Sequence, residues 1–224
     1  MSNFGEKELI FMEATEIVVI NESKIYKLSK RTIDIIGASL GIILLLMLFI
    51  IIGVLIKLDD PKGAILFKQK RVGKNQKEFN MYKFRSMVTD AEFKLADLIQ
   101  KNEVSGAMFK MKEDPRVTKI GKFIRKTSID ELPQLINVLR GEMSLVGPRP
   151  PLPREVKEYS KHDMQRLLVT PGCTGLWQVS GRSNIGFKEM VRLDIKYIKN
   201  RSLSLDLKII MKTIWVLLKT EGSY

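Results

Sequence analysis

The feature that most constrains this chain is an uncharged apolar run of 15 residues, Ile42 to Ile56, which reads IILLLMLFIIIGVLI. As a helix it is about 22 Å long at roughly 1.5 Å per residue, shorter than the roughly 30 Å hydrocarbon core of a bilayer. Extending the segment back to Ile33 gives 24 residues, which is long enough to cross, but the extension includes Asp34. The length therefore leaves two possibilities, a membrane-spanning helix or a helix that enters and leaves on one face.

Basic residues flank the run on both sides and favour the second possibility. Before it stand Lys27, Lys30 and Arg31; after it come Lys57, Lys62, Lys68, Lys70 and Arg71. Because cytoplasmic segments beside membrane helices are rich in Lys and Arg, both ends read as cytoplasmic. We predict a re-entrant membrane helix over residues 30–58, after an N-terminal arm, 1–29, with no assigned function. A domain on the cytoplasmic face, 59–220, and a short tail, 221–224, complete the chain. No small-residue cleavage site follows the run, which argues against a secretory signal peptide.

The charge balance limits the partners. The net charge of +13 favours a polyanion, which could be nucleic acid, an anionic membrane surface or a phosphorylated substrate. Nucleic acid is not expected, because the chain has no aromatic platform or recognition motif to accompany its charge. The single cysteine, Cys173, cannot form an internal disulfide, so nothing requires an oxidising compartment.

Two strands are predicted after the apolar run, Ala64 to Val72 and Glu78 to Met87, joined by a turn. In the second strand, period-two alternation places Lys83 and Arg85 on one face. Two cations on one strand face suit a phosphate group, and a solvated strand face is the equal alternative.

Amphipathic helices account for much of the remainder. One is expected from Ala91 to Ile99, and basic amphipathic helices are expected within the stretches DPRVTKIGKFIRKTS and LSLDLKIIMKTIWVLLKT. In the last of these, Trp215 suits a membrane interface, and helices of this kind lie well on anionic membranes. The predicted fold is therefore α+β, mostly helical and monotopic, with one re-entrant helix, a small β-hairpin and interfacial helices.

Adjacent acids, Asp130 and Glu131, stand in the stretch TSIDELPQLINVLRG, whose apolar spacing predicts a helix that ends at Gly141. Ser128 and Glu131 fit the S-x-x-E capping box, which would explain the acids structurally. Pro133 belongs in a first helical turn, so a later start with Asp130 as the cap is equally possible.

The functional alternative is phosphoryl chemistry. One carboxylate can attack phosphorus while its neighbour holds a divalent metal, and hard oxygen ligands near phosphates suit Mg²⁺. Arg149, fixed between Pro148 and Pro150, has a planar fork that binds phosphate at two points.

At this point a family resemblance can be stated. Four stretches, in order along the chain, resemble the bacterial sugar transferases of the monotopic phosphoglycosyl transferase family. They are KRTIDIIGASLG, DPRVTKIGKFIRKTSIDELPQLINVLRGEMSLVGPRP, TPGCTGLWQVSGR and LDIKYIKNRSLSLDLKIIMKT. The resemblance runs from about Lys30 to Thr220. It implies that residues 59–220 form a catalytic domain at the cytoplasmic face of the inner membrane.

The resemblance also implies a reaction. A sugar 1-phosphate passes from a UDP-sugar to undecaprenyl phosphate, UMP is released, and exopolysaccharide, capsule or glycan synthesis begins. By analogy Asp130 is the catalytic nucleophile, which forms a covalent phosphosugar intermediate, and Glu131 binds Mg²⁺. The positions that match phosphate-binding or substrate-binding residues of the family are Arg149, Arg125, Lys83, Arg85 and Arg182.

One departure from the family and two rival functions stand beside this reading. Family members often break the apolar run with Ser-Pro, where this chain has Leu46 and Met47. The rivals are a membrane-surface binding protein without catalysis and a conventional glycosyltransferase that releases UDP. Asp194 falls on an apolar helix stripe and is expected to make a buried structural hydrogen bond. A catalytic role is not expected for the one histidine, His162.

Overall fold

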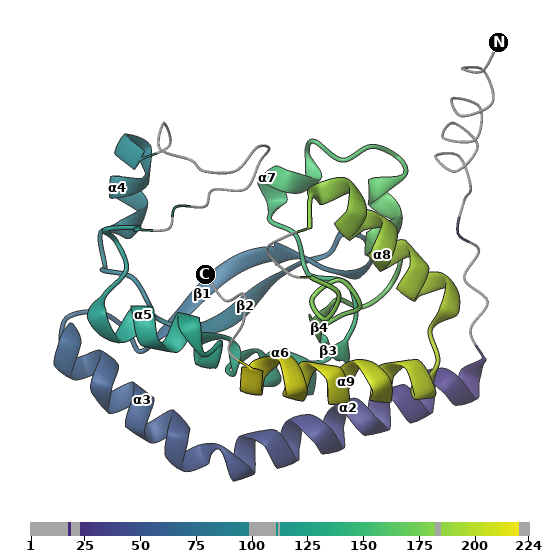
Figure 1. Cartoon of the computed structure of the whole chain (residues 1–224), viewed down its shortest axis with the longest axis horizontal. Helices are drawn as coiled ribbons and strands as arrows, with labels where there is room; N and C mark the ends of the chain where they lie inside the picture. Colours follow the sequence, from purple (N-terminus) through teal and green to yellow (C-terminus); the bar gives the residue numbers. More distant parts are fainter. Residues whose placement is uncertain (1–17, 19–22, 99–110, 112, 182–184, 220–224) are drawn as a thin grey trace.

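The apolar run forms parts of two helices rather than one in the computed structural model, which describes residues 18, 23–98, 111, 113–181 and 185–219. Helix α2 comprises Lys24–Leu44 and α3 comprises Leu46–Asp59, and the chain bends by 60° between them (Figure 1). The break is at Leu45, whose φ of −97° and ψ of 7° are not helical, so the chain bends here without proline. The first helix begins six residues before the predicted position 30. No single helix in the described part of the chain is long and apolar enough to span a membrane, whereas α2 and α3 together meet that test.

One face of α2 packs closely against the rest of the protein. Ala38 is fully buried, and Cβ atoms added at Gly37 and Gly41 would lie 2.7 and 3.0 Å from leucine side chains of the domain. Asp34 lies on the same face because it precedes Ala38 by one helical turn. Its carboxylate accepts hydrogen bonds of 2.9 Å from the Ser144 hydroxyl and from the Leu145 N–H. The acid in the extended apolar segment therefore faces the protein.

The predicted hairpin is present. Strand β1, Leu66–Val72, pairs antiparallel with β2, Glu78–Phe84, around the short 3₁₀ turn η1, Lys74–Gln76. The second strand ends three residues before the predicted Met87. A second sheet, which periodicity did not predict, consists of β3, Ser144–Val146, and β4, Gly172–Thr174, in parallel. Strands of three residues are too short to show an alternation.

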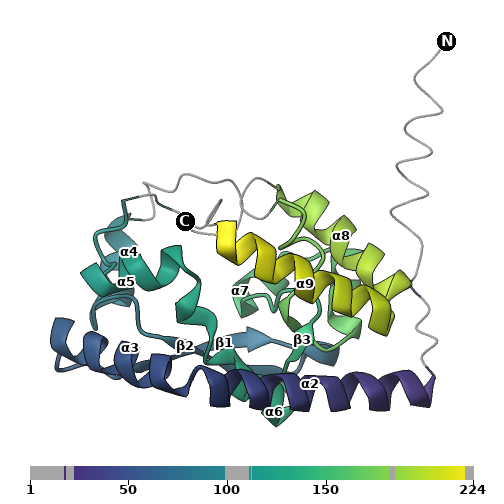
Figure 2. The same cartoon turned by 60° about the horizontal axis from the view of Figure 1, so that its bottom comes forward.

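The other elements are helical, and the predicted α+β class with mostly helices is confirmed. They are α4 (Ala91–Leu98), α5 (Lys119–Lys126), η3 (Ile129–Glu131), α6 (Gln134–Arg140), α7 (Pro153–Val156), η4 (Asp163–Leu168), α8 (Phe187–Asn200) and α9 (Leu203–Lys219). Figure 2 shows α2 and α3 along one side of the molecule, with the hairpin and the helices α4, α5, α8 and α9 above them and α6 at their lower edge.

Buried side chains join α2 and α3 to the domain. Ala38 packs with Met81, Val138 and Met143, which links α2 to β2 and α6. The cluster of α3, β2 and α5 consists of Ile52, Ile56, Phe84 and Ile124. The largest cluster connects β3, α8 and α9 through Val146, Val191, Ile195, Tyr197, Ile198 and Ile209. The broken helix pair is therefore an integral part of the core.

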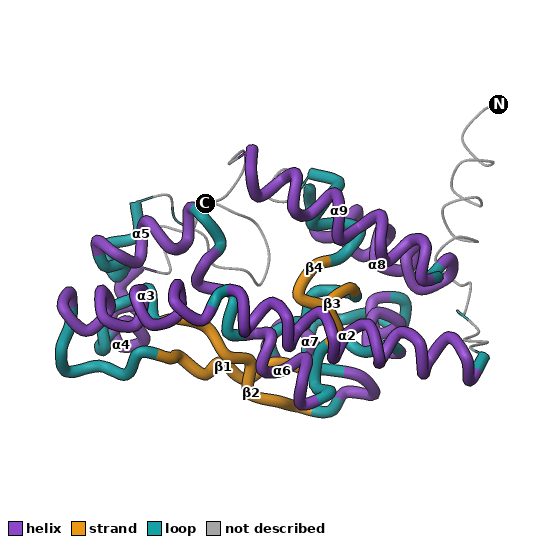
Figure 3. Tube along the Cα trace, turned by 90° about the horizontal axis from the view of Figure 1, so that it is seen from below, coloured by secondary structure: helices purple, strands orange, loops and turns teal. Residues whose placement is uncertain are grey.

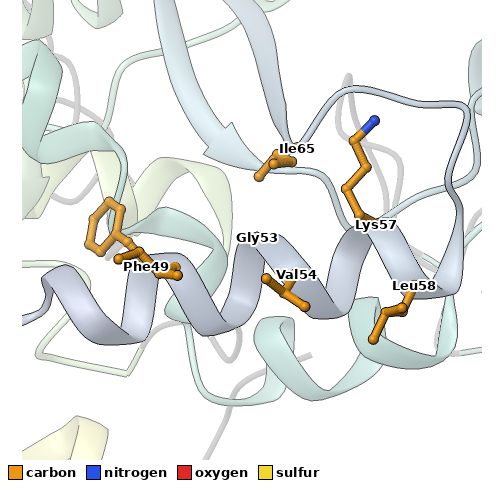
Figure 4. A pocket seen from close by; sticks show the side chains of 7 residues that line it. Phe49, Gly53, Val54, Lys57, Leu58 and Ile65 are labelled. Atoms are coloured by element: carbon orange, nitrogen blue, oxygen red, sulfur yellow. The ribbon is translucent and has the colours of Figure 1, made fainter.

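Large apolar side chains remain exposed on the opposite faces of these helices. On α3 the exposed set includes Leu46, Met47, Ile50, Ile51, Val54 and Leu58; on α9 it includes Leu207, Met211, Ile214 and Trp215. Figure 3 shows α3, α2 and α9 from below. An apolar groove of about 420 Å³ lies on α3, lined by Phe49, Ile50, Gly53, Val54, Lys57, Leu58 and Ile65 (Figure 4). On α5, by contrast, Ile124 is fully buried, and only Phe123 of its predicted apolar stripe is an exposed large side chain.

Candidate active site

The adjacent acids lie in a turn, not in a capped α-helix. Asp130 and Glu131 belong to η3, and Ser128 before them has a left-handed conformation with φ of 57° and makes no capping hydrogen bond through its side chain. The capping box is therefore absent. Helix α6 begins only at Gln134 with Pro133 at its N-cap position, so Asp130 does not cap that helix either. Both structural alternatives for the acids are wrong, because the left-handed residue redirects the chain between α5 and η3.

Lys83 joins the two acids from the neighbouring strand. Its ammonium Nζ lies 2.6 Å from Oε1 of Glu131 and 3.8 Å from Oδ2 of Asp130. The Lys83 side chain is 19% exposed, whereas that of Asp130 is 10% exposed and that of Glu131 is 45% exposed. The strand face that carries Lys83 therefore points at the acids, and the solvated alternative is wrong for this residue.

The surroundings give the two adjacent carboxyl groups different pKa values. Burial raises the pKa of Asp130 to about 6, with Lys83 opposing the shift and Glu131 adding to it. Burial would also raise the pKa of Glu131, but Lys83, Arg149 and Arg71 outweigh this effect and lower it to about 2. Asp130 is therefore the more basic carboxylate of the pair, and Glu131 the more firmly ionised one.

Two of the predicted arginines act on these acids. Arg149 is half-buried, its guanidinium carbon lies 6.0 Å from the centre of the Trp177 ring, and its charge lowers the pKa of Glu131. The charge of Arg125 opposes the rise in the pKa of Asp130. A site with at least three cations around two acids suits a diphosphate.

Arg85 and Arg182 are not brought into this cluster by the described contacts. Arg85 is buried, its Nη1 lies 3.1 Å from the Asp60 carboxylate, and its Nη2 donates to the Asp60 carbonyl at 2.7 Å. A Cβ at Gly63 would lie on this guanidinium, so a glycine is needed there. The role of Arg85 in phosphate binding stays a prediction. Arg182 lies outside the described residues.

Arg71 is a site residue that the sequence reasoning missed, since we counted it only as a charge flanking the membrane segment. It is 4% exposed at the end of β1. Its Nη1 donates to the Pro150 carbonyl at 2.9 Å, and its Nε and Nη2 donate to Gln69. Burial and the nearby charge of Arg149 lower the pKa of Arg71 to about 10. No signal in the sequence set it apart, because its role depends on the Pro150 carbonyl, which is 79 residues away.

The acids also suit the expected metal ion. Mg²⁺ is usually held by one or two carboxylates together with waters and substrate phosphates, and Asp130 and Glu131 supply two adjacent carboxylates. Among the described residues there is no group of three or more His, Cys, Asp or Glu side chains that could hold a metal alone. Two adjacent carboxylates are a donor set that suits Mg²⁺ when waters and phosphate oxygens complete its shell.

Three further residues singled out in the sequence are described by the structure. Asp194 is 1% exposed and accepts from Nε of Arg166 at 2.7 Å, so its expected structural role is confirmed. Burial raises the pKa of the Cys173 thiol, which keeps it protonated. His162 directly precedes η4, with its ring 3.4 Å from the Gln165 amide.

Comparison with known proteins finds one matching family and several relatives with related names. Residues 25–220 match the family described as bacterial sugar transferase. The galactosyl transferase CpsE of Streptococcus agalactiae is 47% identical, over 99% of this chain and 50% of CpsE. An undecaprenyl-phosphate galactose phosphotransferase of Salmonella typhimurium is 43% identical, over 87% of this chain and 41% of that protein. The exopolysaccharide production protein ExoY of Rhizobium meliloti is 40% identical, over 88% of each. The chain thus spans half or less of the first two relatives.

Proposed function

The chain belongs to the bacterial sugar transferase family, and from this premise we propose that it transfers a sugar 1-phosphate from a UDP-sugar to undecaprenyl phosphate. The observation that carries the proposal is the buried Asp130 beside the Glu131–Lys83 ion pair, with the charge of Arg125 acting on Asp130 and that of Arg149 acting on Glu131. The product would be an undecaprenyl-diphosphate sugar, from which a polysaccharide or glycan is built.

In the first step an Oδ atom of Asp130 attacks the phosphorus that carries the sugar. The bond from Oδ to phosphorus forms, the bridging P–O bond of the diphosphate breaks, and the electron pair leaves with UMP. Asp130 suits this role because its raised pKa makes it the more basic of the two acids. Arg149 and Arg125 would stabilise the charge that develops on the phosphate oxygens.

In the second step the phosphate of the lipid acceptor attacks the same phosphorus. The new P–O bond forms as the bond to Asp130 breaks, and the carboxylate is regenerated. The two steps separate a water-soluble donor from a membrane-soluble acceptor, because UMP can leave before the lipid binds.

Glu131 is the residue that would hold Mg²⁺, with Asp130 next to it. When bound, the ion would neutralise the diphosphate oxygens and make UMP a better leaving group. Lys83 would keep Glu131 ionised and ready for this role, since its ammonium is within 2.6 Å of that carboxylate.

The bent helix pair is proposed as a re-entrant anchor in the inner membrane, with the remainder of the protein on the cytoplasmic face. Three observations support this. Both ends of the pair are basic, the face of α3 away from the domain exposes large apolar side chains, and the pair bends by 60° at Leu45. The exposed apolar side chains of α9, with Trp215 among them, would lie at the interface.

Product analysis tests the proposed reaction. Purified protein in lipid nanodiscs is incubated with undecaprenyl phosphate, Mg²⁺ and a panel of UDP-sugars, and the released nucleotide is identified. We expect UMP with at least one donor, and none from the Asp130→Asn variant. The matched control is Asp90→Asn, a surface acid paired with Lys94, which should retain activity. Release of UDP, or no release with any donor, would contradict the proposal.

A further inference from the structure

The segment Pro148–Pro151, which carries Arg149, has an unusual hydrogen-bonding problem. Three of its four residues are proline, so the segment has one backbone N–H and four carbonyl groups. Its prolines are buried, and buried carbonyls need partners. Such a segment cannot pair in a regular sheet, because it lacks donors for the reciprocal bonds. Its acceptors must be satisfied by donors from elsewhere in the fold.

All four consecutive carbonyls find such donors. The Gly172 N–H donates to the Pro148 carbonyl and the Val72 N–H donates to the Pro151 carbonyl, each at 2.9 Å. Between them, Arg166 Nη2 donates to the Arg149 carbonyl at 3.3 Å and Arg71 Nη1 donates to the Pro150 carbonyl at 2.9 Å. The donors come from β4, η4 and β1, so segments about 100 residues apart meet at this backbone.

The two arginines are buried, and each is bonded to several protein groups. Arg166 is 2% exposed, and its other nitrogens donate to Asp194 at 2.7 Å and to the Tyr159 hydroxyl at 2.6 Å. Arg71 is 4% exposed and its remaining nitrogens donate to Gln69. Every nitrogen of both guanidinium groups therefore has a protein acceptor. Both groups are thus engaged by the protein itself, beside the residue that we propose binds phosphate.

We propose that Arg71 and Arg166 are positioning residues, which hold the backbone of the Pro148–Pro151 segment from two sides and thereby aim the Arg149 guanidinium at the phosphates. Only the role given to Arg149 rests on the proposed function. The rigid support has a chemical reason: a flexible arginine must be ordered by each substrate, whereas a fixed one stabilises the transition state without reorganisation. Asp194 and Gln69 extend the arrangement by orienting the two supporting guanidinium groups.

The kinetic test is a double-mutant cycle. Arg71→Lys and Arg166→Lys keep the charge but lose the fork geometry. Each is made alone and together with Arg149→Ala, and UMP release is measured at limiting UDP-sugar. We expect each lysine variant to lose about tenfold in rate when Arg149 is present and less than about twofold when it is absent, because residues that act through one another are not additive. The same loss in both backgrounds would show a merely structural role and overturn the proposal.

The control is Arg116→Lys. Arg116 is also buried at 5% exposure and forms an ion pair of 2.6 Å with Asp114, but it does not contact the Pro148–Pro151 segment through any described hydrogen bond. Any loss that it causes should be the same factor with and without Arg149. This control separates general destabilisation from positioning.

A second measurement requires no turnover. The chain has two tryptophans, so a Trp215→Phe background leaves Trp177 as the single fluorophore beneath the Arg149 guanidinium. Acrylamide quenching without substrate should change in Arg149→Ala, and change similarly in Arg71→Lys and Arg166→Lys. Unchanged quenching in both lysine variants would overturn the positioning role even if the enzyme is active. Changed quenching without UMP release from any donor would uphold it and reject the proposed function alone.

Discussion

The ammonium group of Lys83 lies 2.6 Å from the carboxylate of Glu131, which is 48 residues away in the chain. Asp130 is 3.8 Å from the same ammonium and is more deeply buried. Lys83 thus pairs with Glu131, whose pKa is about 2, and leaves Asp130 with the higher pKa of about 6. This difference supplies a physical reason for the division of labour that the family resemblance implied, in which Asp130 attacks and Glu131 holds the metal ion.

Replacing Lys83 should impair the reaction more than replacing a surface lysine. In Lys83→Met two adjacent acids lose their shared counter-charge and repel the diphosphate, so we expect UMP release to fall by about a hundredfold. Lys83→Arg keeps the charge and should retain more activity. The surface variant Lys94→Met is the matched control for loss of a lysine paired with an acid. Equal rates for Lys83→Met and the wild type would reject the assigned role.

Asp130→Asn should abolish turnover yet stabilise the fold at neutral pH. The folded pKa is raised from 3.8 to about 6, so between these values the folded state binds a proton that the unfolded state has lost, and stability falls as pH rises through this window. Removing the charge should raise the free energy of unfolding by about 1–3 kcal/mol above pH 6. The gain should vanish below about pH 4. Chemical denaturation with EDTA at both pH values measures it.

Glu131→Gln should lower the free energy of unfolding, opposite to Asp130→Asn, and serves as the internal comparison. Its folded pKa is lowered from 4.5 to about 2, so its ionised form contributes stability above about pH 4.5 that is lost as pH falls through 2. The variant should therefore be less stable than the wild type at pH 7, by a small amount because the side chain is 45% exposed. Stabilisation by both substitutions would contradict the separation of the two pKa values.

The bent helix pair predicts that its two ends lie on one side of the membrane. In a Cys173→Ala background, single cysteines replacing Lys27 and Lys62 should both be protected from an impermeant maleimide in intact cells. Both should react after the membrane is opened. A cysteine engineered on a periplasmic marker protein controls for reagent access. Labelling of one position but not the other in intact cells would establish a span and reject re-entry.

Trp215 should lie in the membrane interface and Trp177 should not. Trp215 is 54% exposed among the apolar side chains of α9, whereas Trp177 is 9% exposed beside Arg149. Brominated lipids should therefore quench the fluorescence of the Trp177→Phe variant strongly and that of Trp215→Phe weakly. Equal quenching of the two variants would show that α9 does not contact the bilayer through this face.

Local sequence patterns predicted the helices and strands of this fold better than they predicted the contacts between them. The hairpin of β1 and β2, the amphipathic helix α4 and the helix end at Gly141 agree with the periodicity, because each depends on neighbouring residues. The capping box at Ser128 was wrong because a backbone rotation at one residue removed it. Periodicity also missed the parallel pair of β3 and β4, whose strands are three residues long.

The site is divided in the same way, into residues that the sequence could name and residues whose roles depend on tertiary contacts. Adjacent acids, a strand lysine and an arginine between prolines could be named from the sequence as candidates for a phosphate site, beside the alternatives of a helix cap and a solvated strand face. Arg71 could not be distinguished from a charge that flanks a membrane helix, and Arg85 could not be separated from Lys83. Their roles depend on which acceptors meet them, namely Pro150 for Arg71 and Asp60 for Arg85.

By itself the sequence determined that this protein has an apolar helical segment, a basic surface and a pair of adjacent acids, because composition and short-range spacing are properties of the chain alone. Only the tertiary structure decided that the segment bends at Leu45, that Lys83 pairs with Glu131, and that two buried arginines hold the backbone on which Arg149 is carried. The physical reason is that ion pairing and burial act between atoms brought together by packing, and separations of tens of residues leave no local periodicity.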